Sequence, residues 1–304
     1  MSLISILKGS LHLAGIIHNP PISTGRSPGV VVIHPGGGVK EQVANDYAQR
    51  ISQEGFVSVA FDALYQGTSE GLPRFLEDPD SRTSDVSAVV TYLQSLDNVD
   101  PYAIAVVGIC AGGGYGIAAA TVDHRIKAVA AVSLVNIGDS TRLGWMNTLN
   151  HTDALAVLDD AQARLQGTAL SGNTTFVPFL PTPGPDTPRD LVDAWEYYRT
   201  PRGYYNTSQN IMDGSSTPLL MRFDAWQWVD RYLSQPTLLI AGTDADSRWQ
   251  TDKVYERIQN TNPNVTRLLV PGGRHMDFYD REEYVGPALA NITEFLNLHL
   301  SGRG

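Results

Sequence analysis

The only cysteine of the chain, Cys110, lies at the centre of the sequence Gly-Ile-Cys-Ala-Gly at 108–112, directly after the apolar run 103–107. A Gly-x-nucleophile-x-Gly pattern between a strand and a helix forms a sharp turn that strains its central residue and needs glycines where side chains would collide. A thiol there is a strong nucleophile, and the backbone amides of a helix that begins at Ala111 favour its charged form. The alternative interpretation is a small buried core residue that happens to fall between glycines.

Candidates for the two groups that would assist this thiol follow later in the chain, each after an apolar run. His275 follows the run 266–270 and is the candidate base, which would take the thiol proton and later return it. Asp244 and Asp246 both follow the run 237–241, and either of them could hold the imidazole in the correct tautomer. We favour Asp246 and expect the other aspartate to be a solvated or turn-capping carboxylate. The order nucleophile, acid, histidine is that of enzymes which mount a nucleophile on such a turn.

A glycine-rich segment, His-Pro-Gly-Gly-Gly at 34–38, follows the first expected core strand. Its backbone can supply one N–H group to a developing oxyanion, paired with the N–H of the residue after the nucleophile. Gly37, with its neighbour Gly36, and Ala111 are therefore the candidate oxyanion donors. No Gly-Lys-Ser/Thr follows, so the segment does not fit a phosphate-binding loop. Tyr65 leaves the next strand toward the same rim and is a candidate substrate contact, although a packing role explains it equally well.

Apolar runs alternate with helical patterns from residue 29 onward, which is typical of a largely parallel sheet with helices on both faces. One or two antiparallel edge strands are expected at 11–17, before this alternation begins. We expect core strands at 29–33, 57–61, 103–107, 127–134, 237–241 and 266–270, and helices over 43–51, 86–96, from 111 and over 285–296. The sequence therefore predicts the α/β class.

Residues 138–232 interrupt this alternation with helical pieces and many of the aromatic residues of the chain. We expect a core of residues 1–137 and 233–304, and an insertion at 138–232 that lies as a lid over the carboxyl edge of the sheet, where ligands of open α/β folds bind. Trp145 and Tyr205 are candidate substrate contacts in that insertion. For most of its aromatics, packing against the core is the simpler interpretation.

Composition excludes several classes of function. The 22 Lys and Arg against 32 Asp and Glu give a net charge of −10, which argues against nucleic acid and provides no basic patch for an anionic membrane. No apolar stretch approaches the roughly 20 residues of a membrane helix, and the first ten residues do not resemble a signal peptide. A single cysteine fits a reducing compartment, so we expect a cytoplasmic protein. Neither a metal-ligand spacing nor a dinucleotide fingerprint is present, so we expect no metal and no cofactor.

Four segments together resemble the dienelactone-hydrolase-like branch of the α/β-hydrolases: HPGGGVKEQ at 34–42, FDALYQG at 61–67, GICAGGGY at 108–115 and DHRIKAV at 123–129. Within that branch they are similar to bacterial members and to fungal polyketide transferase and thiohydrolase proteins of secondary-metabolite clusters. The resemblance implies an α/β-hydrolase fold, to which the insertion at 138–232 adds the expected helical lid. It also supports Cys110 as nucleophile and His275 as base. Ala245 stands where many relatives carry the acid, so a flanking aspartate would have to substitute.

The resemblance and the site candidates together predict a cysteine-dependent acyl hydrolase or acyltransferase of the thioesterase type. Such an enzyme would release or transfer a polyketide-type acyl group through an acyl-enzyme on Cys110. The expected partner is a small-molecule acyl thioester or ester, which a polyketide synthase carrier protein could deliver. Two alternatives stay open: an intramolecular cyclase that forms a lactone or a carbon–carbon bond, and a non-catalytic binding protein on a hydrolase scaffold. The acyl acceptor and the oligomeric state stay open as well.

Overall fold

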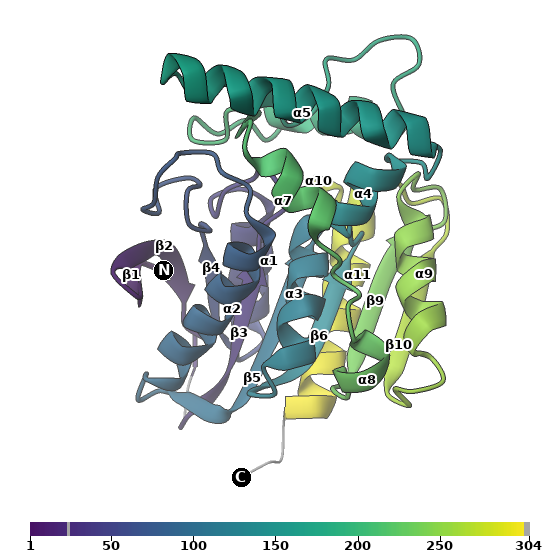
Figure 1. Cartoon of the computed structure of the whole chain (residues 1–304). Coiled ribbons are helices and arrows are strands. Elements are labelled where there is room, and N and C mark those ends of the chain that lie inside the picture. Colours follow the sequence, from purple (N-terminus) through teal and green to yellow (C-terminus); the bar gives the residue numbers. More distant parts are fainter. Residues whose placement is uncertain (23–24, 301–304) are drawn as a thin grey trace.

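The computed structural model describes residues 1–22 and 25–300, and an eight-stranded sheet forms the centre of that part of the chain (Figure 1). The strand order is β1-β2-β4-β3-β5-β6-β9-β10. β2 (Leu11–His18) pairs antiparallel with β1 (Ser2–Lys8) and with β4 (Val57–Phe61). From β4 onward all pairs are parallel, through β3 (Ser27–Ile33), β5 (Val99–Ile109), β6 (Ile126–Val132), β9 (Thr237–Gly242) and β10 (Val265–Val270). The mostly parallel sheet with an antiparallel edge is confirmed.

Helices cover both faces of this sheet, because its central strands are apolar on both sides. Successive side chains point to opposite faces, so Val30 and Val32 join one apolar cluster while Val31 joins the other. One cluster includes α1 (Val43–Gln53) and α11 (Glu282–Leu300). The other includes α2 (Pro79–Gln94), α3 (Ala111–Val122) and α9 (Arg248–Ile258). The molecule is therefore a three-layer α/β/α sandwich.

Residues 138–232, which we call the insertion segment, connect the neighbouring strands β6 and β9. Figure 1 shows its long helix α5 lying across the end of the molecule where the core strands have their carboxyl ends. A short two-stranded sheet, β7 (Phe176–Pro178) with β8 (Ile211–Asp213), had no counterpart in the sequence prediction. The helices are α4 (Ile137–Leu143), α5 (His151–Ser171), α6 (Arg189–Arg199), α7 (Ser216–Arg222) and α8 (Val229–Tyr232). The segment thus covers the edge of the sheet at which ligands of α/β folds bind.

No helix among the described residues is both long enough and apolar enough to cross a membrane.

Candidate active site

Cys110 occupies a sharp turn between β5 and α3. Its backbone angles, φ 55° and ψ −124°, are strained for a residue with a side chain. The neighbouring glycines permit this turn, because a Cβ on Gly108 would collide with the backbone of Gly112, and a Cβ on Gly112 would collide with that of Ile33. The Cys110 N–H donates to the Val132 carbonyl at 3.0 Å and ties the turn to the next strand. The strained turn predicted for Cys110 is present, with the thiol at its apex.

Two backbone N–H groups converge on the sulfur of Cys110. They belong to Gly36, in the loop after β3, and to Ala111, the first residue of α3. Gly37 has a positive φ of 67°, and its carbonyl accepts a hydrogen bond from the Ser208 hydroxyl of the insertion segment at 2.7 Å. Of the predicted oxyanion donors, the structure therefore directs Gly36 and Ala111 at the sulfur, whereas Gly37 fastens the loop.

Burial controls the ionisation of Cys110 and raises the pKa of its thiol to about 11. Hydrogen bonds from the Tyr279 hydroxyl and from the Ala111 and Gly36 amides, with the positive charge of Arg82, act in the opposite direction. The amides at the start of α3 thus favour the thiolate as the sequence predicts, but burial outweighs them. At neutral pH the resting group is a thiol, and a base must remove its proton during any reaction.

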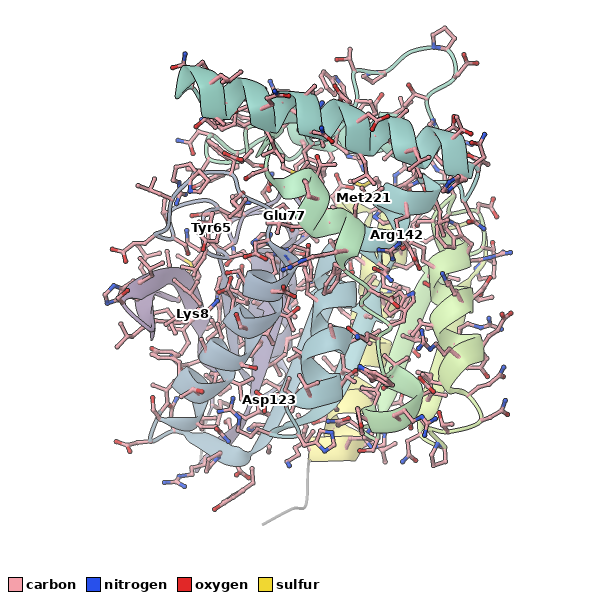
Figure 2. All side chains as sticks on the ribbon, viewed as in Figure 1. Lys8, Tyr65, Glu77, Asp123, Arg142 and Met221 are labelled. Atoms are coloured by element: carbon pink, nitrogen blue, oxygen red, sulfur yellow. The ribbon has the colours of Figure 1, made fainter. Side chains whose placement is uncertain are left out.

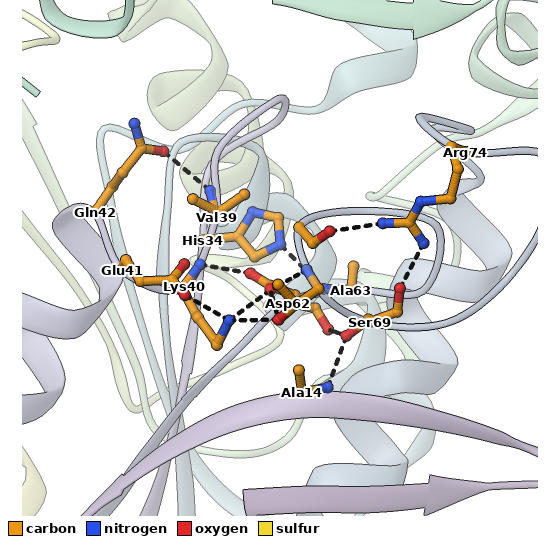
Figure 3. Close-up of polar contacts among 12 residues, drawn as sticks. Ala14, His34, Val39, Lys40, Glu41, Gln42, Asp62, Ala63, Ser69 and Arg74 are labelled. Carbon is orange, nitrogen blue, oxygen red and sulfur yellow. Dashed lines mark hydrogen bonds and ion pairs between the residues drawn. The ribbon is translucent and has the colours of Figure 1, made fainter. Parts of the chain in front are cut away.

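The loop that carries Gly36 is anchored by a buried carboxylate, shown in Figure 3. Asp62, at the end of β4, accepts from the backbone N–H of Lys40 at 2.7 Å and from the Lys40 ammonium at 2.8 Å. It also accepts from the Thr68 N–H at 2.8 Å. Both partners of the Lys40–Asp62 ion pair are almost completely buried. Asp62 therefore holds the loop after β3 against the loop after β4.

A second buried charge, Arg82 of α2, lies beneath the same loop. Its guanidinium donates to the His34 carbonyl and to the His34 ring Nε2, each at 2.8 Å, and pairs with Glu77 at 3.4 Å. Burial and the charge of Arg82 hold the pKa of His34 well below its usual range, so His34 is neutral. Glu77 also accepts from the Tyr115 hydroxyl at 2.7 Å. This network supports the loop and places a positive charge near Cys110.

His275 lies after β10, at the same edge of the sheet as Cys110, and is buried. Its Nδ1 is 2.7 Å from the Ser247 Oγ, and its Nε2 is 3.4 Å from the Tyr279 hydroxyl. Burial lowers the pKa of His275 to about 3, so the imidazole is neutral at pH 7. The contacts at the two ring nitrogens fix the orientation of the ring.

Neither aspartate predicted as the acid contacts the ring of His275. Asp246 Oδ2 accepts from the backbone N–H of Asp190 at 3.1 Å, and Asp244 accepts from the hydroxyl of the preceding threonine at 2.9 Å. Ser247, the residue directly before α9, takes the place expected for the carboxylate, because the loop after β9 turns its side chain toward the histidine. The prediction of an aspartate partner therefore disagrees with the structure.

A carboxylate from the insertion segment lies behind this pair. Asp190, near the start of α6, is buried, and its two oxygens accept the backbone N–H groups of His275 and Ser247, each at 3.3 Å. Burial and the neighbouring charge of Asp246 raise the pKa of Asp190 to about 6. Asp190 therefore positions the two loops that carry His275 and Ser247 without contacting the imidazole ring.

A small cavity of about 40 Å³ lies in front of Cys110 and His275, and apolar side chains form most of its wall. Trp145 of the insertion segment packs edge-to-face on His275, with ring centroids 5.0 Å apart. Phe179 packs directly on the backbone of Gly36, where a Cβ would collide with its ring. Both aromatic rings also line a larger cavity of about 310 Å³ beneath α5 and α7. Phe179 is thus one of the side chains that line both cavities, together with Ile137, Trp145, Leu180 and Leu191.

The set of groups around Cys110 has the parts needed for covalent acyl chemistry: a thiol, a neutral imidazole and two converging N–H donors. Within residues 1–22 and 25–300, no three His, Cys, Asp or Glu side chains gather in a way that could hold a metal ion.

Comparison with known proteins identifies the family of the chain. The model of the dienelactone hydrolase family matches residues 13–133, a range that contains the turn at Cys110 and the loop after β3. The uncharacterized protein YcjY of Escherichia coli is 40% identical over 289 residues, which are 94% of each chain. The chain belongs to the dienelactone hydrolase family. Its fold is accordingly that of the α/β-hydrolases.

Two further relatives extend the comparison. The crystal structure of the hypothetical protein PA2218 from Pseudomonas aeruginosa superposes on this family member with a TM-score of 0.92 at 30% identity, covering 98% of this chain and 93% of that one. The polyketide transferase claH of Penicillium crustosum is 33% identical over 151 residues, which are 50% of this chain and 47% of claH. The family relationship therefore reaches both bacterial and fungal proteins.

Of the three aromatic side chains predicted to contact substrate in this dienelactone hydrolase family member, only Trp145 lies beside the candidate nucleophile. Tyr65 packs against Gly71 and lines neither cavity, and Figure 2 shows it on the side of the molecule where β1 and β2 lie. Its packing role, the alternative interpretation, is the one the structure favours. Tyr205 lines a separate polar pocket of about 430 Å³ on the surface, together with Arg50 and Arg202.

Four side chains of this site were not predicted from the sequence: Ser247, Asp190, Phe179 and Tyr279. For Tyr279 a signal was available, because it follows His275 by four residues and a helical turn there would place both on one side. Ser247 directly precedes a helical pattern, where serine is usually a cap. No local pattern distinguishes Asp190 or Phe179, whose positions depend on how the insertion segment packs on the core.

Proposed function

We propose that the chain is a cysteine-dependent acyl hydrolase or acyltransferase of the thioesterase type, which forms an acyl-enzyme on Cys110. The observation that best supports this proposal is the convergence of the Gly36 and Ala111 N–H groups on the Cys110 sulfur. An acyl group attached to that sulfur would place its carbonyl oxygen within reach of the same donors. Oxyanion stabilisation of this kind is usually the largest single contribution to acyl-transfer catalysis.

The proposed reaction has two balanced steps. The Cys110 sulfur attacks the acyl carbonyl, its proton moves toward His275, and collapse of the oxyanion expels a thiol or alcohol that takes the proton. Water, an alcohol or an amine then loses a proton to His275 as it attacks the thioester, and the sulfur leaves and is reprotonated. A neutral His275 can accept a proton in each step, so the chemistry needs no metal or cofactor.

The substrate class follows from the surroundings of the sulfur. Apolar side chains line most of the cavity at Cys110 and of the larger cavity beneath α5 and α7, which favours a largely apolar acyl chain. The similarity to a polyketide transferase supports an acyl group of polyketide type. In this proposal the substrate is an acyl thioester or ester, free or on a carrier protein, and the insertion segment acts as a lid.

A second outcome, ring closure within the acyl chain, is favoured by the small size and apolar wall of the cavity at Cys110. Exclusion of water would let a hydroxyl or carbanion of the bound chain attack the thioester instead of water. Turnover in heavy-oxygen water separates the two outcomes, because hydrolysis incorporates the label into the product and cyclisation does not.

The test of the proposed function is turnover of a panel of acetyl, butyryl and octanoyl thioesters by wild type, Cys110→Ala and Ser58→Ala. We expect Cys110→Ala to lose turnover completely. Ser58 is the matched control, because its buried hydroxyl bonds to the Ala48 carbonyl, away from the described site. Ser58→Ala should turn over the substrates at close to the wild-type rate. Full turnover by Cys110→Ala would contradict the proposal.

A further inference from the structure

The hydroxyl of Tyr279 lies between the two side chains to which the proposed function assigns the chemistry. It is 3.4 Å from His275 Nε2, and it also hydrogen-bonds to the Cys110 sulfur. The described residues show no direct hydrogen bond between Cys110 and His275, whose ring contacts Ser247 and Tyr279 instead. Among the hydroxyl groups of residues 1–22 and 25–300, Tyr279 is thus the one whose hydrogen bonds include both members of the pair.

We propose that Tyr279 is a catalytic residue, whose hydroxyl passes the proton between the Cys110 thiol and His275. This inference rests on the proposed acyl chemistry at Cys110 and adds a third proton-carrying group to it. The separation of 3.4 Å from His275 is long for a hydrogen bond at rest. Catalytic hydrogen bonds are often long in the free enzyme and tighten when substrate binds.

The surroundings of Tyr279 hold its hydroxyl in place. The residue is buried on the short helix α10 (Asp277–Asp280), and its ring packs against the rings of His275 and Tyr197, with centroids 5.8 Å and 5.2 Å away. The preceding residue, Phe278, is fixed by a hydrogen bond from the Tyr47 hydroxyl to its carbonyl at 2.9 Å. A relay group must keep its position within a fraction of an ångström, and a phenol packed in this way meets that need.

The proposed transfer conserves protons and charge at Tyr279. As the sulfur forms its bond to the acyl carbon, the thiol proton moves to the phenol oxygen and the phenol proton moves to His275 Nε2. The carbonyl electron pair moves to the oxygen that faces Gly36 and Ala111. Burial raises the pKa of Tyr279 well above its usual range, so the hydroxyl is protonated at rest and is regenerated after the transfer. Because Nε2 receives the proton in this transfer, Nδ1 must carry the hydrogen of the neutral imidazole and donate it to Ser247 Oγ, 2.7 Å away.

Tyr197 offers a matched control. Its ring belongs to the same cluster of tyrosines, but its hydroxyl accepts from the backbone N–H of Val43, away from the sulfur and the imidazole. Tyr197→Phe and Tyr279→Phe therefore remove the same atom from neighbouring buried rings. Only the second change would interrupt the relay.

The primary experiment measures the rate at which a butyryl thioester acylates Cys110, by quenched-flow intact-protein mass spectrometry. We expect Tyr279→Phe to react about 100-fold more slowly than wild type, the lower range for loss of a positioned acid–base group. Tyr197→Phe should react at close to the wild-type rate. Acylation of Tyr279→Phe within about threefold of wild type would overturn the relay. If wild type itself were not acylated by any thioester, the proposed function would fail and the relay with it.

A second readout does not need an acyl substrate. Once the thiol has lost its proton, the Tyr279 hydroxyl can donate to the sulfur and stabilise the thiolate, which lowers the pKa of the Cys110 thiol from what burial alone would give; that pKa is about 11. Tyr279→Phe should therefore raise that pKa and slow alkylation by iodoacetamide at pH 9, whereas Tyr197→Phe should not. An unchanged pH profile of alkylation in Tyr279→Phe would overturn the assignment, even if wild type were acylated.

Should Tyr279→Phe fail to fold, wild type alone still provides a test. Acylation rates in mixtures of light and heavy water report how many protons move in the transition state. A relay through Tyr279 moves two protons and predicts a curved dependence on deuterium content. A direct transfer from thiol to imidazole moves one proton and gives a straight line, which would overturn the proposal.

Discussion

Replacement of Ser247 by alanine tests whether His275 works without a carboxylate partner. In the structure Ser247 Oγ lies 2.7 Å from His275 Nδ1 in a buried place. Ser247→Ala removes that acceptor and leaves a buried N–H without its partner, which costs about 1–3 kcal/mol of folding stability. The fold itself should survive, because the loop is still held by Asp190 through backbone N–H groups.

The expected loss of rate in Ser247→Ala depends on how much stronger the hydrogen bond between Ser247 and His275 becomes when His275 is charged. A neutral hydrogen bond contributes about 1 kcal/mol, and one from a charged group contributes about 1.5–3 kcal/mol. Only the difference, about 1.5 kcal/mol, is gained when His275 becomes charged in the transition state, and this corresponds to about a tenfold rate effect. A true triad carboxylate is worth far more, about 10⁴ in kcat. We therefore expect Ser247→Ala to acylate about tenfold more slowly than wild type.

The assay is single-turnover acylation by an acyl thioester, with Ser58→Ala as the control for loss of a buried hydroxyl, and urea unfolding of both variants. A loss of about 1,000-fold or more in Ser247→Ala would contradict this prediction, because a hydrogen bond to a neutral hydroxyl cannot supply that much transition-state energy. An unchanged acylation rate in Ser247→Ala would also contradict the prediction, because it would show that Ser247 does not support His275.

Three further predictions follow from the geometry. Phe179→Ala should widen the connection between the cavities of about 40 Å³ and 310 Å³ and raise kcat/KM for octanoyl relative to acetyl thioester by about tenfold; an unchanged ratio would contradict a role of Phe179 in separating the two cavities. Asp62→Asn should lower the free energy of unfolding in urea by about 3 kcal/mol, because it leaves the buried Lys40 without its main counter-charge; a loss below about 1 kcal/mol would show that Glu41 suffices. Burial holds the pKa of His275 at about 3, below its usual 6.5, so the unfolded chain takes up a proton first and stability falls as pH drops from 6.5 toward 3. Between pH 7 and pH 5 wild type should therefore lose about 2 kcal/mol more than His275→Gln, and equal losses in urea unfolding would contradict the neutral, buried imidazole.

The order of the core elements could be predicted because each central strand is a continuous apolar run bounded by turn residues. The first residue of a helix was harder to predict where the helix begins with polar residues. The apolar stripe of α2 starts at Val86, whereas the helix starts at Pro79, capped by Asp78, which accepts from the Asp80 N–H. The three-residue strands β7 and β8 are too short to show any periodicity.

The site likewise has one part that could be predicted from the sequence and another that could not. The turn at Cys110 is local, since its glycines are needed within a few residues of the thiol, and the sequence alone was enough to predict it. The partner of His275 is not local. Whether Asp244, Asp246 or Ser247 faces the imidazole depends on the path of the loop after β9, and that path depends on Asp190 of the insertion segment. Such a contact between distant segments leaves no pattern in a single sequence.

The proposed function requires Cys110 to act as a nucleophile. Wild type and Cys110→Ser are exposed briefly to the acyl thioester panel, and intact-protein mass spectrometry with peptide mapping locates any adduct. We expect one acyl group on Cys110 of wild type, which disappears faster when an alcohol or amine is added, and no thioester adduct at this position in Cys110→Ser. Consumption of the thioester by wild type without an acyl group at Cys110 at any time point, and at an equal rate by Cys110→Ser, would contradict the proposed function.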